Sequence, residues 1–306
     1  MKDWEELLIK IYYSICDLYE EDLKWYSQRY SNNTSWLTSQ ALEFTDEEAL
    51  SVSLFGILQK RRNTLEIYTY AKDHLESWFP RLPSYQKFNE RLNRLSPSLG
   101  RLVHRLLLEV KFPEWLIKPQ TLIDTLVDSM PIILAKGSRS DNAKIALEVA
   151  DKGYCASKKL YYHGLKLHHL GISVPSTIPL PLQFALSRAS ANDNRIFKEQ
   201  IASLYRDLRV YGDKIYFDKE VFEDFKNDYR IHVLACQKRK KGQKYLFADQ
   251  KFFNTMISQI RQPIESFFNW LEQKTSIQMA SKVRSLKGLF KHVYGKLAAA
   301  LFLLIF

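Results

Sequence analysis

The 306-residue sequence predicts an α/β protein in which an all-helical N-terminal domain precedes a mixed five-stranded sheet flanked by helices. Apolar residues recur at three- and four-residue steps up to about Val110, as they do on the buried face of a helix. In the remainder, short β-like runs alternate with helical ones. Pro113 and Pro119 mark a linker between the two patterns, so we expect a helical domain at residues 1–118 and an α/β domain at residues 119–306.

The helical domain is predicted from apolar stripes and from the signals at their ends. A first stripe runs from Trp4 to Tyr19. Thr45-Asp46-Glu47-Glu48 is a capping-box pattern, so a second helix begins there. A further stripe covers Ile67–Trp78 and is stopped by the proline-containing segment Phe79–Pro83. The last predicted helix of this domain covers about Leu99–Val110.

A basic helix follows the proline-containing turn. Ser84 can cap this helix, which runs to about Leu95. Lys87, Arg91 and Arg94 lie on it, and these residue types contact phosphates and base edges in DNA complexes. An ordinary helical bundle with a polar outer face would carry the same residues. We therefore take the three as candidate DNA contacts and keep the bundle as the alternative.

Three consecutive strands open the α/β domain. Thr125-Leu126-Val127 is a short β-like run that ends at Asp128. Lys159–Gly171 alternates as a strand does, with Gly164 as a break. Ile178–Ser187 is another apolar, β-compatible stretch. Together these segments predict three consecutive strands in an antiparallel meander.

The rest of the domain alternates helices and strands. Ile196–Leu208 is predicted to be helical, and Val210-Tyr211 is a short strand that delivers Asp213. Another helix precedes a fifth strand at Ile231–Ala235, and a long helix then carries Glu265. The resulting order, β-β-β-α-β-α-β-α, is that of a ribonuclease H-like fold.

Three carboxylates, Asp128, Asp213 and Glu265, follow or lie on elements that this fold would bring together. Hard carboxylate oxygens are the ligands that Mg²⁺ prefers. Asp124 and Asp218 compete with the two aspartates. Asp124 precedes the strand run, and Asp218 is better placed to cap the next helix.

Other polar and aromatic residues near these motifs have competing interpretations. His168 and His169 point to opposite faces of one strand, so one of them could lie near the acids, but a hydrogen-bonded structural histidine is the favoured interpretation. Asp193 is interpreted as structural. Trp270 could stack on an unpaired base, although core packing is the commoner role.

The composition favours a soluble cytoplasmic protein that binds polyanions. The net charge is +11, while residues 1–50 carry 4 Lys/Arg and 11 Asp/Glu, so the basic surplus lies in the remainder. Three scattered cysteines without a C-x-x-C pair argue against zinc and disulfides. The apolar C-terminal run Leu297–Phe306 is about half the length that a membrane span needs and is predicted to be a core helix. We expect no membrane partner.

The densest basic run, with Lys238, Arg239, Lys240 and Lys241, follows the fifth strand and precedes the long helix. We predict that it contacts DNA phosphates. A solvated surface loop is the alternative.

Several motifs occur in the order found in a known family. Val127–Pro131 resembles its first-aspartate motif, and Gly164–His168 resembles its Gly-x-Lys-x-His strand. Ser190–Asp193 matches the segment before the next helix, Gly212–Tyr216 resembles the second-aspartate motif, and Arg261–Glu265 resembles the Arg-x-x-x-Glu motif. On these motifs the chain resembles insertion-sequence transposases of the DDE superfamily, which have a ribonuclease H-like catalytic domain.

The chain departs from the family pattern at three positions. Ser258 stands where many relatives have Tyr, Glu272 where they have Lys, and Ile215 where they have Gly. Because Lys274 lies near the position of the missing lysine, it is a candidate phosphate contact together with Arg261.

The resemblance implies a mechanism and partners. Asp128, Asp213 and Glu265 would hold two Mg²⁺ ions, with Mn²⁺ as a substitute, and catalyse cleavage at transposon ends and strand transfer into target DNA. The partners would be double-stranded DNA, namely terminal inverted repeats and target, bound by a homodimer near the bacterial nucleoid. Two alternatives remain open: a ribonuclease H-like nuclease without strand transfer, and a catalytically inactive DNA-binding protein derived from a transposase.

Overall fold

The structure is a computed structural model that describes residues 3–19, 44–114, 121–217, 219–239 and 241–306. By contacts within the chain these fall into two compact units, Met1–Val110 with Leu271–Phe306, and Lys111–Trp270. Each unit is considered by itself. The predicted domain division at residues 118 and 119 lies outside the described residues and stays a prediction.

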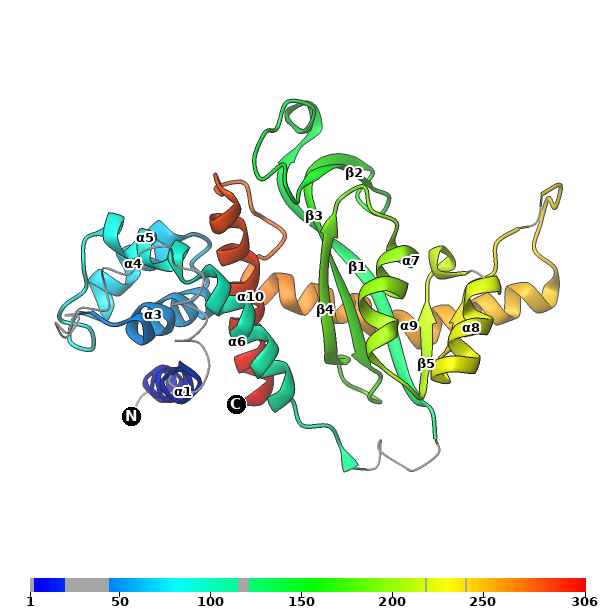
Figure 1. The fold of residues 1–306 in the computed structure, drawn as a ribbon, viewed down its shortest axis with the longest axis horizontal. Helices are drawn as coiled ribbons and strands as arrows, with labels where there is room; N and C mark the ends of the chain where they lie inside the picture. Colours follow the sequence, from blue (N-terminus) through cyan, green and yellow to red (C-terminus); the bar gives the residue numbers. More distant parts are fainter. Residues whose placement is uncertain (1–2, 20–43, 115–120, 218, 240) are drawn as a thin grey trace. The chain divides into compact units, whose positions relative to one another are not determined.

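The first unit is helical, as predicted (Figure 1). Its helices are α1 (Asp3–Leu18), α3 (Asp46–Leu58), α4 (Thr64–His74), α5 (Tyr85–Arg94), α6 (Ser96–Glu109) and α10 (Leu286–Ile305). The capping box before α3 is confirmed: Glu48 N donates to Thr45 Oγ1 at 3.2 Å and Thr45 N donates to Glu48 Oε2 at 2.6 Å. Ser84 occupies the predicted N-cap position of α5, but its side chain makes no capping hydrogen bond.

Helix α10 contributes a large part of this unit's core. It packs on α3 and α6, and its residues from Lys296 to Phe302 are all buried. By length and composition α10 could cross a membrane, but 56% of its apolar window is buried inside the protein. The prediction that the apolar C-terminal run belongs to a core helix is confirmed.

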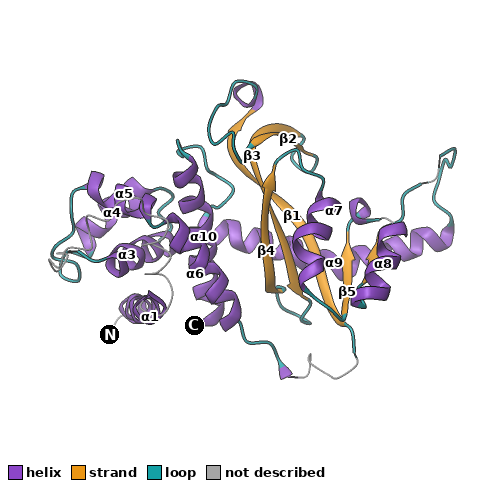
Figure 2. Cartoon of the chain, in the orientation of Figure 1, coloured by secondary structure: helices purple, strands orange, loops and turns teal. Residues whose placement is uncertain are grey.

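The second unit contains one mixed sheet, formed by six strands in the described residues (Figure 2). The strands are β1 (Ile123–Lys136), β2 (Asp151–Cys155), β3 (Leu160–Ile172), β4 (Leu180–Arg188), β5 (Leu208–Gly212) and β6 (His232–Ala235). Strand β3 pairs antiparallel with β1 on one edge and with both β2 and β4 on the other. Strands β5 and β6 continue the sheet beyond β1 in parallel.

The predicted fold class is confirmed. An antiparallel β1–β3–β4 meander is followed by β5 and β6, each reached through helical segments, and then by a long helix. These helices are α7 (Asp193–Ile196), α8 (Lys219–Tyr229) and α9 (Ala248–Thr275). The helix predicted at Ile196–Leu208 begins three residues earlier, as α7. Irregular helical turns continue α7 from Phe197 to Leu204, where the helical segment ends. The arrangement is ribonuclease H-like.

The prediction that the first strand ends at Asp128 is wrong. Strand β1 continues for eight residues past Asp128, through Pro131 to Lys136. The proline is tolerated because β1 pairs with β5 only up to Leu126, so one edge of the following stretch needs no ladder partner.

Gly164 and the edge strand β2 also differ from expectation. Gly164 does not break β3, because the strand runs through it. A Cβ there would lie 1.9 Å from the Ile132 carbonyl oxygen, so only glycine allows β1 to approach this closely. Strand β2 was not predicted, because its five residues include Gly153 and carry little apolar alternation.

Different helices cover the two faces of the sheet, as Figure 1 shows for α7 and α9. On one face Val127 and Leu170 pack with Ile196 and Phe197 from the α7 segment. On the other face the His169 ring stacks on Phe267 of α9, with ring centroids 4.0 Å apart. Because side chains alternate along a strand, neighbouring residues of β1 and β3 face different helices.

We predict that His292, on α10 in the first unit, destabilises the fold in acid. Burial lowers the pKa of His292 to about 3, and its Nε2 donates to the Ile277 carbonyl at 2.9 Å. Between pH 6.5 and 3 the unfolded chain binds this proton and the folded chain does not, so stability falls as pH falls through that window. His292→Gln keeps a donor but does not titrate. Urea unfolding should show a pH slope that is shallower by up to about 1.4 kcal/mol per pH unit.

His104→Gln, which replaces an exposed histidine on α6 of the same unit, is the matched control. An unchanged slope in His292→Gln would contradict the burial of a neutral imidazole.

Candidate active site

Two of the three predicted acids lie just beyond the last pair of residues that joins β1 to β5. The parallel register ends with Leu126 opposite Tyr211. Asp128 is two residues beyond Leu126, and Asp213 is two residues beyond Tyr211. The two carboxylates therefore occupy corresponding positions on neighbouring strands. Consistent with this placement, the charge of Asp213 acts on Asp128.

Arg261 of α9 joins the third acid to the first. Its Nη2 lies 2.9 Å from Asp128 Oδ2 and 3.5 Å from Glu265 Oε1. Arg261 and Glu265 are four residues apart, so one face of α9 presents both to β1. The Asp128 side chain is 22% exposed and that of Glu265 is 62% exposed, so the cluster opens to solvent on the Glu265 side.

The electrostatics of this cluster favour a cation beside Asp128. Burial raises the pKa of Asp128 because it disfavours the carboxylate, while Arg261 and the Ser129 amide oppose this and the charge of Asp213 reinforces it. Burial acts to lower the pKa of Arg261, but Asp128, Asp213 and Glu265 outweigh it, and the net pKa is raised. Arg261 is the positive charge that makes the buried carboxylate tolerable.

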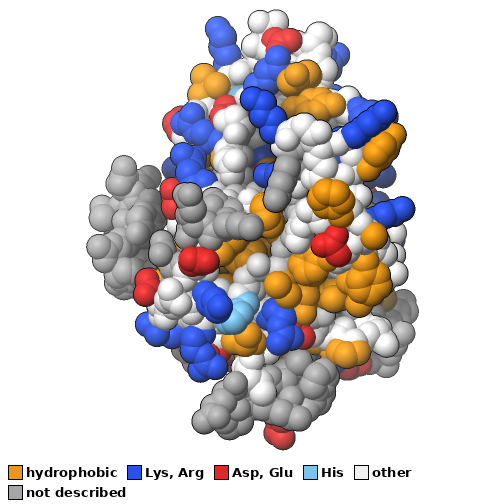
Figure 3. All heavy atoms as spheres, turned by 90° about the vertical axis from the view of Figure 1, so that its right-hand side faces the viewer, with side chains coloured by type: hydrophobic (Ala, Val, Ile, Leu, Met, Phe, Trp, Pro, Cys, Tyr) orange, Lys and Arg blue, Asp and Glu red, His pale blue; other side chains and the backbone are white. Residues whose placement is uncertain are grey.

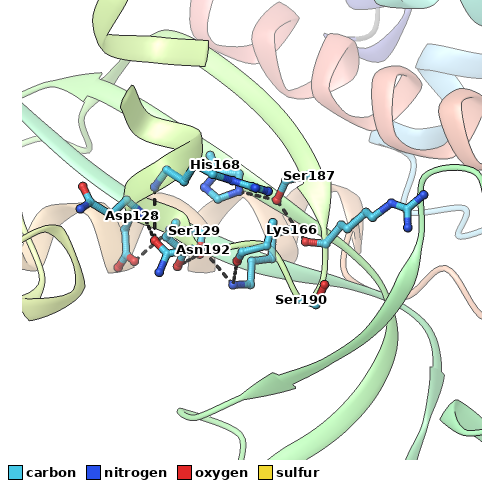
Figure 4. A network of polar contacts seen from close by, with 12 residues as sticks. Asp128, Ser129, Lys166, His168, Ser187, Ser190 and Asn192 are labelled. Carbon is cyan, nitrogen blue, oxygen red and sulfur yellow. Dashed lines mark hydrogen bonds and ion pairs between the residues drawn. The ribbon is translucent and has the colours of Figure 1, made fainter. Parts of the chain in front are cut away.

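A polar network contacts β1 on the face of the sheet that is opposite to α9 (Figure 4). Ser129 Oγ donates to Asp193 Oδ2 at 2.9 Å, and Lys166 Nζ donates to Asp193 Oδ1 at 2.7 Å and to the Ala191 carbonyl at 2.8 Å. Asp193 lies at the start of α7, so these bonds join β1, β3 and α7. The network therefore holds Ser129, the residue after Asp128, while the Asp128 carboxylate makes none of these bonds.

A buried hydroxyl without a hydrogen-bond partner lies near the acids. Tyr216 is fully buried, and among the described residues nothing bonds its hydroxyl group. Burial raises the pKa of Tyr216 far above its ordinary value, and the charges of Asp128, Asp193 and Asp213 raise it further. The hydroxyl therefore stays protonated, and its donor is unused among the described residues.

The two neighbouring histidines of β3 are buried on opposite faces, as predicted from the alternation. His168 Nε2 and Ser187 Oγ lie 2.8 Å apart. Both ring nitrogens of His169 lack partners among the described residues, and the ring stacks on Phe184 and Phe267. Burial lowers the pKa of His168 to about 4 and that of His169 to about 3. Both rings are neutral at physiological pH.

The competing aspartates are placed as follows. Asp124 Oδ1 accepts from Arg209 Nη1 at 3.0 Å and from the Tyr211 hydroxyl at 3.4 Å. Asp218 lies outside the described residues. Trp270 packs on Phe267, with ring centroids 5.7 Å apart.

The candidate DNA contacts of α5 differ in exposure. Lys87 is exposed. Arg94 Nη2 lies 2.8 Å from Asp46 Oδ1, while Arg91 lies 3.6 Å from the same oxygen and bonds the Phe44 carbonyl. Two of the three side chains therefore bind within the helical unit.

The remaining candidate phosphate contacts are exposed where they are described. Lys238, Arg239, Lys241 and Lys274 are exposed, and Lys240 lies outside the described residues. Figure 3 views the molecule from the side of α8 and the segment after β6 in Figure 1. It shows lysine and arginine side chains spread more widely over this face than acidic ones.

The carboxylate oxygens of the three acids are of the chemical type that binds divalent cations. Their oxygens are hard ligands of the kind that Mg²⁺ takes, and two of them already share one positive group. Among the described residues, however, no three His, Cys, Asp or Glu side chains are grouped closely enough to hold a metal ion. Metal binding by Asp128, Asp213 and Glu265 stays a prediction.

The comparison with known families agrees with this site. Residues 120–303, more than half of the chain, match the family model of the transposase DDE domain. The chain belongs to this family of DDE transposases, and the predicted resemblance is confirmed. Transposases of this family bind DNA as substrate and generally use divalent metal ions. A search of curated proteins gave no match.

Sequence reasoning gave no role to three residues that the structure brings to the site. Lys166 and Tyr216 lay within recognised motifs, and Asp193 was interpreted as structural, but no partner was predicted for any of them. The alternation of β3 does place Lys166 and His168 on one face. The contact with Asp193 depends on how the chain returns to the sheet after β4, which no local pattern reveals.

We predict that Lys166 and Asp193 are strongly coupled in stability. Their side chains are 16% and 12% exposed, so removing either one leaves a poorly solvated charge. Lys166→Met and Asp193→Asn should each destabilise the protein by roughly 3 kcal/mol, and the double variant by clearly less than the sum. Urea unfolding measures all four proteins.

The exposed ion pair of Lys152 and Asp141 in the same unit is the control, with an expected coupling below about 1 kcal/mol. Additive effects at Lys166 and Asp193 would contradict the network.

Proposed function

We propose that this protein cleaves DNA at the ends of a transposable element and joins the freed 3′ ends to target DNA. The observation that carries the proposal is the position of Asp128 and Asp213 beyond the last β1–β5 pair, with Glu265 joined to Asp128 through Arg261. These are the first aspartate, second aspartate and glutamate expected of the family.

The three acids would hold two Mg²⁺ ions, with Mn²⁺ as a substitute. When bound, such ions activate the attacking oxygen and stabilise the leaving oxygen. The partial burial of Asp128 supports this assignment, because a carboxylate in that environment gains most from a nearby cation.

Arg261 would bind the phosphate that reacts. The Arg261 side chain is 14% exposed, and its guanidinium contacts both Asp128 and Glu265, so it already lies between the acids. A guanidinium offers a planar fork of donors that matches phosphate oxygens. Exchange of a carboxylate partner for a phosphate oxygen would let Arg261 orient the scissile group without acting as an acid or base.

The DNA partners and the assembly are also proposals. Terminal inverted repeats and target DNA would be the substrates, contacted by the exposed Lys87, Lys238, Arg239, Lys241 and Lys274. Strand transfer joins two transposon ends to target DNA, and each joining reaction needs an active site, so we expect a homodimer on the DNA. We expect this complex in the bacterial cytoplasm, associated with the nucleoid.

Loss of any one acid should abolish catalysis but not DNA binding. Asp128→Asn, Asp213→Asn and Glu265→Gln should each lower Mg²⁺-dependent cleavage by more than about a hundredfold, because each removes an oxygen ligand. The substrate is a duplex that carries the DNA flanking the coding region. Cleavage is read on denaturing gels, and binding by fluorescence anisotropy.

Asp124→Asn, on the same strand, is the matched control and should cleave normally. Full activity in any of the three acid variants would remove that residue from the site. Cleavage without joining of pre-cut 3′ ends would identify a nuclease, and DNA binding without cleavage by the wild type would identify an inactive derivative.

Tyr216→Phe should separate stability from activity. The lost hydroxyl has no partner, so its removal should leave stability unchanged or raise it by about 1 kcal/mol. If the hydroxyl donates to a substrate or water oxygen beside the acids, kcat should fall by about tenfold or more while DNA affinity holds.

Thermal unfolding and single-turnover cleavage measure the two effects. Tyr205→Phe, which removes a hydroxyl that bonds the Leu182 carbonyl, is the opposite control and should lose stability. Unchanged turnover in Tyr216→Phe would limit Tyr216 to core packing.

A further inference from the structure

A pocket in the helical unit lies apart from the acids in sequence and uses none of them. It has a volume of about 450 Å³ and is formed entirely by residues of the first unit. Its walls come from the start of α4, from α5 and from residues 282–296, which include the first half of α10. Pockets of a few hundred cubic ångströms are the size that holds a small ligand.

The pocket is lined by positive charge. Five cationic side chains line it, and no lining residue is an aspartate or a glutamate. The five are Arg62, Lys282, Arg284, Lys291 and Lys296. In the part of the chain that the structure describes, none of them makes an ion pair. Glu272 and, less strongly, Glu66 act on Lys296 through their charges, but neither forms an ion pair with it. The Glu272 carboxylate accepts from the Gln278 amide, and the Glu66 carboxylate accepts from the Arg62 amide and the Asn63 side chain.

Two of these cations are largely shielded from water. Lys296 is 2% exposed, and its Nζ donates to the Ser276 carbonyl at 2.9 Å. Lys291 Nζ donates to Asn89 Oδ1 at 2.8 Å. Each ammonium group has three donors, and the neutral acceptors use only part of them. Among the described residues no acid acts on Lys291, while the charges of Glu272 and Glu66 act on Lys296 from outside the pocket lining. Burial lowers the pKa of both groups to about 8, so holding both charges here costs free energy that a bound anion would offset.

Two helix starts add to the positive potential. Asn63 is the N-cap of α4 and Ser285 the N-cap of α10, and both line the pocket. The amide groups of a helix's first turn carry partial positive charge, which favours anions. The helix starts support the site, while the five cations and the cavity define it.

We propose that this pocket binds a phosphate group, supplied either by a DNA strand or by a free phosphorylated compound of about nucleotide size. Several cations around one cavity match the multiple charge of a phosphate better than that of a carboxylate, and Arg62 and Arg284 offer the fork geometry that phosphate oxygens accept. The site does not depend on the proposed catalytic role of the acids.

The test compares two double variants of the full chain, each of which replaces two cationic side chains by neutral glutamine. Lys282→Gln with Arg284→Gln removes two exposed cations from the pocket rim. Lys72→Gln with Lys287→Gln removes two exposed cations of the same unit that do not line it. The net charge change is identical, and all four side chains are exposed, so folding should hold in both variants.

The probes are inorganic pyrophosphate, followed by calorimetry, and a 5′-phosphorylated duplex, followed by fluorescence anisotropy. Both are measured without divalent metal and in the Asp128→Asn background, so a failure of the catalytic proposal leaves this test intact. The pocket variant should bind at least one probe about tenfold or more weakly than the control variant. Lys291→Met, whose folding is checked by urea unfolding, should show the same loss from inside the cavity.

Weakened duplex binding would assign the pocket to a phosphate of DNA. Weakened pyrophosphate binding with normal duplex binding would assign it to a free phosphorylated compound. Equal binding of both probes by the pocket and control variants would overturn the proposal.

Discussion

The early end of the β1–β5 ladder is the constraint on which the site depends. Up to Leu126 the central strand is paired on both edges, and beyond it only β3 remains. Asp128, which is still on β1, and Asp213, which follows β5, each lie two residues beyond that point. The two carboxylates are therefore near each other where one edge of β1 needs no ladder partner. Asp124, on the paired stretch two residues before Leu126, is bound to Arg209 instead.

The second constraint is electrostatic. A half-buried carboxylate beside another acid is costly to ionise, and Arg261 offsets that cost from α9. The same guanidinium reaches Glu265, so one ion pair network sets both the register of α9 on the sheet and the position of the third acid. On the opposite face, Lys166 and Asp193 compensate each other, and Ser129 ties β1 to that pair. Asp128 thus contacts Arg261 on one face of the sheet, while the next residue, Ser129, is bonded to the Lys166–Asp193 pair on the other.

The elements with strong local patterns could be predicted from sequence. The strands predicted at β3 and β4, the stripe of α1 and the capping box of α3 each depend on residues close in the chain, and each was confirmed. The extension of β1 through Pro131 was not predicted, because it depends on which edge of the strand loses its neighbour.

The contacts of Glu272, one of the residues that departs from the family pattern, could not be predicted either. The sequence shows a glutamate where relatives have lysine, but not that its carboxylate accepts the Gln278 amide and acts on the charge of Lys296. Both partners lie in the helical unit, where the chain after α9 turns back. A lysine at this position would face the cations of the phosphate pocket, so the acidic residue is consistent with that basic cavity.

The acid cluster and the basic pocket have opposite charge, so they suit opposite kinds of ligand. At the acids, one arginine serves three carboxylates, so the local surplus is negative and suits cations. In the pocket, five cations face no lining acid, so the surplus is positive and suits phosphate. If metal ions act on one bond while the protein holds the DNA, as we propose, keeping these surpluses on separate residues would serve both tasks. Lysines placed among the acids would compete with metal for the same oxygens, and acids in the pocket would repel the strand.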